Sequence, residues 1–167
     1  MQLYILILLL IAIAIFGNIF HKHRRWRQEK NIRTASRVLT RVRTLPDANV
    51  IPYLRKIDPF VFEELLLTVF EEKGYKVIRN KRYTGDGGID GRIIENGNIV
   101  LIQAKRYKSY VSREHIMNFR KLIEHSNSNK GYFIHTGKTG SDTLKNSSDK
   151  KLIIISGHKL IKLICSV

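Results

Sequence analysis

An acid, an amide and an ammonium group stand at matched positions of a predicted β-hairpin. Asn96-Gly97 forms its loop, because this pair strongly favours a two-residue type I′ turn. A loop of this length sets the register, so Asp90 faces Gln103, and Lys105 lies two residues further on the same side. Facing Cβ atoms are about 4.5–5.5 Å apart. The three functional groups therefore converge at one end of the hairpin.

These side chains suit metal-assisted chemistry on a phosphate. Asp90 and the amide oxygen of Gln103 are hard oxygen ligands of the kind that bind Mg²⁺ or Mn²⁺. Lys105 is suited to position or deprotonate an attacking water, or to stabilise charge on a phosphate. The glycine-rich segment 84–88 leaves room opposite for a ligand or for close backbone approach. Geometry alone leaves a structural polar cluster as an equal alternative.

A helix is predicted to begin at Asp58-Pro59, an N-cap followed by a first-turn proline, and to end at Gly74. Glu63 lies on the margin of its apolar face, where a metal or a cation would explain a carboxylate. The alternative is an ordinary charged boundary residue. Glu64 falls on a face predicted to be solvated. The apolar stripe has i, i+3, i+4 spacing and consists of Phe62, Leu65, Leu66, Val69 and Phe70.

The remaining elements predict a three-layer α/β domain around a mixed sheet. Residues 99–102 are apolar on both faces, which indicates a central strand covered by helices on both sides. The predicted strands cover residues 75–78, 89–95, 98–105, 131–135 and 152–155. The predicted helices cover residues 112–125 and 159–164, with a shorter one near Ser141.

Several ordered motifs resemble the Mrr-like branch of the PD-(D/E)xK nucleases, which commonly reads FE, GY, GGxD and QxK. The resemblance spans about Ile57 to Ile164. Later segments that resemble this branch are Gly131 to Gly137 and Ile155 to Leu160. The earlier matching residues are Phe62-Glu63-Glu64-Leu65, Gly74-Tyr75, Gly85 to Asp90, and Gln103-Ala104-Lys105-Arg106-Tyr107.

The resemblance implies a restriction-endonuclease-like fold and Mg²⁺-dependent hydrolysis of DNA phosphodiesters. By position, Asp90 is the central metal ligand, and Gln103 stands where many relatives carry a second acid. Lys105 matches the motif lysine and Glu63 the helix glutamate that completes the metal site. Mrr-like enzymes often carry a separate DNA-reading domain. This chain shows no such specificity motif, so sequence preference is not carried over.

The N-terminus predicts a membrane anchor. Leu3 to Phe20 is almost entirely apolar, and the basic run from His21 to Arg27 follows directly. The sequence therefore predicts a single-pass membrane protein, with its nuclease domain in the cytoplasm at a bacterial inner membrane. A buried hydrophobic helix is the alternative. The predicted division is a transmembrane helix at 1–20, a basic juxtamembrane stalk and linker at 21–56, and the endonuclease domain at 57–167.

The net charge of +16 favours anionic partners, DNA and the membrane surface. Arg106, Tyr107 and Lys108 follow the site lysine and are candidate DNA contacts, with a solvated loop as the alternative. A homodimer is expected, since one active site cuts one strand. Two other functions stay open: a catalytically weak or inactive module that tethers DNA at the membrane, and a structural protein that binds lipid and a protein partner.

Overall fold

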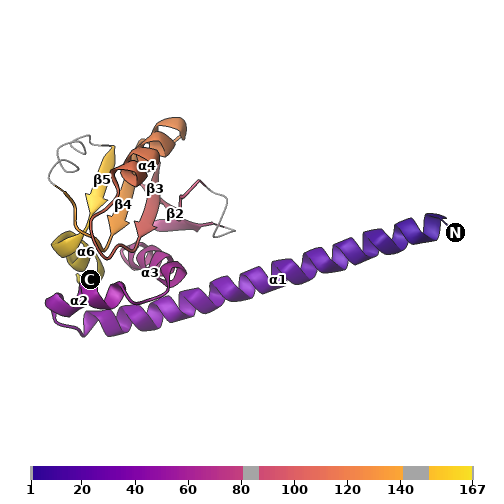
Figure 1. Cartoon of the computed structure of the whole chain (residues 1–167), viewed down its shortest axis with the longest axis horizontal. Coiled ribbons are helices and arrows are strands. Elements are labelled where there is room, and N and C mark those ends of the chain that lie inside the picture. Colours follow the sequence, from indigo (N-terminus) through magenta and orange to yellow (C-terminus); the bar gives the residue numbers. More distant parts are fainter. Residues whose placement is uncertain (1, 81–86, 141–150, 167) are drawn as a thin grey trace.

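In the computed structural model, a long helix precedes a mixed α/β domain (Figure 1). The structure describes residues 2–80, 87–140 and 151–166, with only some of the side chains before residue 22. The predicted helix near Ser141 and the loop residues Thr84 to Asp86 lie outside this part of the chain. The helices are α1 (Gln2–Arg43), α2 (Asp47–Leu54), α3 (Pro59–Glu72), α4 (Arg113–His125) and α6 (Gly157–Cys165). The strands are β1 (Lys76–Arg79), β2 (Gly91–Glu95), β3 (Asn98–Lys105), β4 (Lys130–His135) and β5 (Leu152–Ile155).

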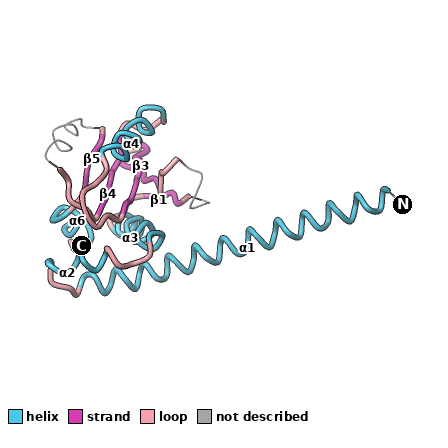
Figure 2. The backbone as a smooth tube through the Cα atoms, in the orientation of Figure 1, coloured by secondary structure: helices cyan, strands magenta, loops and turns pink. Residues whose placement is uncertain are grey.

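The sheet has the order β1-β2-β3-β4-β5, antiparallel through β3 and parallel from β3 to β5. Residues of β3 alternate between two apolar clusters. Val100 and Ile102 pack with α3 and α6 on one face, and Leu101 packs with α4 on the other. Figure 2 shows these helices on opposite sides of the sheet. The predicted mixed sheet with a central β3 is therefore confirmed.

The hairpin register is also confirmed. Asn96 and Gly97 have φ angles of 50° and 79°, as a type I′ turn requires. Gly91 pairs with Ile102 and Glu95 with Asn98, which is the predicted alignment. Strand β2 begins at Gly91 rather than at Ile89, because the chain leaves the sheet at Asp90.

Helix α3 begins as predicted, with Asp58 accepting hydrogen bonds from the backbone N–H groups of Phe60 and Val61. Its apolar stripe is buried against the sheet. The prediction for Glu64 is wrong, because this residue is only 2% exposed. Helix α1 packs across the face of α3 that the sequence suggested was solvated (Figure 1).

The second half of α1 belongs to the core. Ala35, Leu39 and Val42 are at most 1% exposed, as are Val50 and Leu54 of α2. Arg43 donates to the carbonyl of Ile164 and forms an ion pair with Glu72. The segment expected to be a solvated stalk thus supplies buried side chains, because its small and apolar residues recur on one helical face.

The structure corrects the prediction of a membrane anchor. Within the described residues, no helix combines the length and apolar character needed to cross a membrane. The predicted single-pass localisation at a bacterial inner membrane is therefore wrong. The apolar run begins the continuous helix α1, which carries basic residues further along, and it is the later part of this helix that packs onto the domain.

Candidate active site

Asp90 lies where the chain leaves the edge of β2. Its backbone N–H donates to the carbonyl of Ile102 at 2.9 Å, and its Oδ2 accepts from the backbone N–H of Ala104 at 2.7 Å. The carboxylate thus takes over one ladder hydrogen bond of β3. Burial raises the pKa of Asp90 to about 6, against the lowering effects of the Ala104 hydrogen bond and the charge of Lys105.

Gln103 occupies the neighbouring position on β3 and is 6% exposed. Its Nε2 donates to the carbonyl of Gly88 at 2.6 Å. Gly88 has φ +93°, and a Cβ there would lie 2.5 Å from Nε2, so this contact requires glycine. The Oε1 of Gln103 is buried and has no hydrogen-bond partner among the described residues. A buried acceptor of this kind calls for a ligand.

Glu63 reaches the same place from α3. Burial and, next, the negative charge of Asp90 raise the pKa of Glu63 to about 8, against the lowering effect of Lys105. Glu63 therefore lies within electrostatic range of Asp90 and Lys105. Two carboxyl groups with raised pKa values in one site favour a cation between them.

Lys105 lines a pocket of about 310 Å³ at the end of β3. The predicted DNA-contacting residues differ in where they lie. Tyr107 and Arg106 also line this pocket, and Arg106 donates through Nη1 to the carbonyl of Arg55 at 2.8 Å. Lys108 is exposed. The pocket is completed by Gly87, Gln103, His115 and Asn118.

The donor set fits a hard divalent cation. Two carboxylates and one unpartnered amide oxygen are oxygen ligands suited to Mg²⁺ or Mn²⁺. No cluster of three or more His, Cys, Asp or Glu side chains suited to a metal occurs in the described residues. A metal held here would depend instead on the amide of Gln103, whose oxygen binds more weakly than a third carboxylate would.

The family follows from comparison with known proteins. A family model described as restriction endonuclease, of the Mrr catalytic type, matches residues 54–164. This chain belongs to the Mrr restriction endonuclease family. The Mrr family assignment agrees with the motifs in the sequence and identifies the domain as a restriction-endonuclease-like nuclease domain.

One curated protein and one solved structure resemble this chain. The chain is 30% identical over 122 residues to the type IV methyl-directed restriction enzyme EcoKMrr of Escherichia coli strain K12. The match covers 68% of this chain and 40% of that enzyme, so the chain spans less than half of its relative. The structure of MspJI restriction endonuclease in complex with a 27-mer oligonucleotide has a TM-score of 0.52 and 24% identity. The match covers 70% of this chain and 30% of the MspJI chain, and it supports the restriction-endonuclease-like fold.

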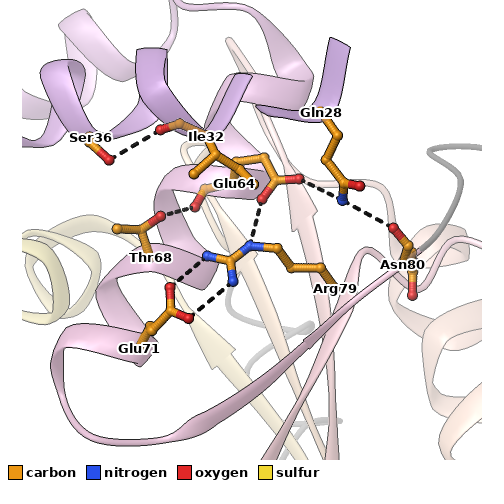
Figure 3. A network of polar contacts seen from close by, with 8 residues as sticks. All are labelled: Gln28, Ile32, Ser36, Glu64, Thr68, Glu71, Arg79 and Asn80. Atoms are coloured by element: carbon orange, nitrogen blue, oxygen red, sulfur yellow. Dashed lines mark hydrogen bonds and ion pairs between the residues drawn. The ribbon is translucent and has the colours of Figure 1, made fainter. Parts of the chain in front are cut away.

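A polar network near Asp90, part of which is drawn in Figure 3, could not be predicted from the sequence. Asn80 donates to the carbonyl of Ile89, directly before Asp90, and accepts from Arg92 at 2.9 Å. Gln28 of α1 donates to the carbonyl of Asn80 at 3.1 Å and to Glu64 at 3.3 Å. Helix α1, outside the residues matched to the family, thus contacts Asn80, whose side chain in turn holds the carbonyl before Asp90.

Proposed function

We propose that this chain is a metal-dependent DNA endonuclease that hydrolyses phosphodiester bonds. Glu63, Asp90 and Gln103 would hold Mg²⁺, with Mn²⁺ as a substitute, and Lys105 would assist the attacking water. The observation that carries the proposal is the convergence of two carboxyl groups of raised pKa and a buried, unpartnered amide oxygen beside a lysine.

The chain's own residues account for most of the chemistry. Lys105 lies in an open pocket, where its ammonium group donates hydrogen bonds to a phosphate oxygen or holds the attacking water. The bound ion would neutralise phosphate charge and lower the pKa of water. The water oxygen bonds to phosphorus as one ester P–O bond breaks, which leaves a phosphate monoester and a hydroxyl. Asp90 is held by the Ala104 N–H and so is pre-positioned as a ligand.

DNA is the proposed substrate. The net charge of +16 favours a polyanion, and Arg106 and Lys108, together with the ring of Tyr107, are proposed to contact the DNA beside the cleaved bond. Because the E. coli relative is described as methyl-directed, methylated DNA is one of the first substrates to compare. Cutting both strands would use two sites, so we also propose a homodimer on DNA; sedimentation that shows only monomer on DNA would contradict it.

The test is cleavage of supercoiled and linear DNA, methylated and unmethylated, by the full chain with Mg²⁺ or Mn²⁺. Asp90→Asn and Lys105→Ala should each lower the rate by about 10²–10⁴-fold. Lys76→Ala is the control, because it removes an exposed lysine on β1 outside the pocket. Cleavage that persists in both site variants would exclude this site. DNA binding without cleavage by the parent would favour a DNA-tethering module instead.

A further inference from the structure

The pocket beside Lys105 has the character of an anion site. Its described lining contains the cationic Lys105 and Arg106, the hydrogen-bonding side chains of Tyr107, His115 and Asn118, and no acidic residue. Its volume of about 310 Å³ has room for a phosphate group and is open to solvent. Lys105 and Arg106 come from the end of β3 and its continuation, whereas His115 and Asn118 come from α4. One strand of DNA entering the pocket would therefore touch two walls.

Tyr107 is held rigidly between these walls. Its backbone N–H donates to Thr136 Oγ1 at 3.0 Å, and the same hydroxyl donates back to the Tyr107 carbonyl at 3.0 Å. Thr136 is 1% exposed. Gly137 packs so closely that a Cβ there would lie 2.6 Å from Tyr107 Cβ. These contacts fix the backbone of Tyr107, while its ring packs edge-on against His135 and presents its hydroxyl to α4.

That hydroxyl orients His115. Tyr107 Oη is hydrogen-bonded to His115 Nδ1, and the two rings stack with centroids 6.0 Å apart at 27°. When the phenol donates to Nδ1, the proton of the neutral imidazole lies on Nε2, and the imidazolium also carries a proton there. Nε2 of His115 is therefore a donor both in the neutral ring that accepts from the phenol at Nδ1 and in the charged ring. His115 is exposed, so this donor is available to a ligand in the pocket.

We propose that His115 donates from Nε2 to a non-bridging oxygen of a DNA phosphate next to the cleaved bond, with Tyr107 as its positioning residue. The proposal rests on the proposed function for its substrate. Asn118 lies three residues after His115, on the same face of α4, and extends this wall. A phosphodiester is the ligand class because it is anionic and offers only acceptors, and both charged side chains that line this pocket, Lys105 and Arg106, are cationic.

The experiment is equilibrium binding of a labelled DNA duplex to the full chain without divalent metal, so that no cleavage occurs. His115→Ala should weaken binding by about tenfold, the usual effect of losing a hydrogen bond to a charged group. His115→Gln retains an N–H donor and should lose less. Tyr107→Phe keeps the ring and loses the orienting hydroxyl, so it should also weaken binding. The double variant Tyr107→Phe with His115→Ala should bind no worse than His115→Ala alone.

His125→Ala is the matched control. His125 is exposed at the end of the same helix and lies outside the pocket, so this variant should bind as the parent does. Duplexes in which single phosphates are replaced by neutral methylphosphonates identify the contact. The His115→Ala deficit should disappear at one position, where the charge has already been removed. A deficit that persists at every position but disappears on an abasic duplex would mean base stacking and would overturn the phosphate assignment.

The two proposals fail separately. If His115→Ala binds within twofold of the parent, or if His125→Ala loses as much, the His115 assignment is wrong even when the parent cleaves DNA. If the parent binds DNA, shows the His115 effect and never cleaves, the endonuclease proposal fails while the phosphate contact stands.

Discussion

Removing the guanidinium of Arg79 should reveal how strongly the buried carboxylate of Glu64 depends on it. Arg79 Nε lies 3.0 Å from Glu64 Oε2, and the two side chains are 20% and 2% exposed (Figure 3). Breaking a buried pair costs about 3–5 kcal/mol, because one charge stays in a poorly solvated place. Since Arg79 is partly exposed, we expect the lower end for Arg79→Met, about 3 kcal/mol. For a chain of this length that corresponds to a fall of roughly 6–12 °C in Tm.

Two further variants isolate the cause. Glu71 is the other carboxylate on Arg79 and is 55% exposed, so Glu71→Gln should cost at most about 1 kcal/mol. The double variant Arg79→Met with Glu64→Gln should regain part of the loss, because it removes the buried charge as well. Urea unfolding followed by circular dichroism measures all of them. Equal losses for Arg79→Met and Glu71→Gln, or a double variant less stable than Arg79→Met, would refute the reasoning.

Two other predictions concern the site. Without divalent metal, Glu63 should contribute a fall in the free energy of unfolding as the pH rises from about 4.5 to about 8, because the folded state holds a proton on Glu63 that the unfolded chain releases at its ordinary pKa of 4.5. Comparison with Glu63→Gln separates this contribution from the opposite one of buried His135, whose pKa is lowered to about 4. Asp90 should contribute to the same fall up to about pH 6. Glu63→Gln or saturating Mn²⁺ should make the dependence of stability on pH less steep. A calorimetric profile that neither of them changes would contradict the burial of Glu63. Gly88→Ala should weaken Mn²⁺ binding, measured by calorimetry, because its Cβ would lie 2.5 Å from Gln103 Nε2. Gly97→Ala is the control: Gly97 has φ +79° and open space around it, so this variant should lose stability but not Mn²⁺ affinity. An equal loss of Mn²⁺ affinity in Gly88→Ala and Gly97→Ala would argue against Gln103 as a ligand.

Some features follow from local chemistry and could be read from the residues alone. The Asn96-Gly97 turn determines the hairpin register, and through it the approach of Asp90, Gln103 and Lys105. Asp58 and Pro59 define the start of α3, because a cap is satisfied by its immediate neighbours. The ordered motifs around these residues indicated the family for the same reason, since they lie at set positions along one chain.

Other features depend on how the helices and strands pack against one another, and only the tertiary structure determines them. Glu64 is buried because α1 lies across α3, and no periodicity within α3 reveals that cover. Asn80 holds the carbonyl before Asp90, and His115 meets Tyr107, through contacts between residues distant in sequence. The membrane prediction was wrong, because no helix in the described part of the chain has the length and apolar character of a span. Periodicity and turn chemistry are properties of neighbouring residues, whereas burial and the pKa shifts it causes are properties of the assembled fold.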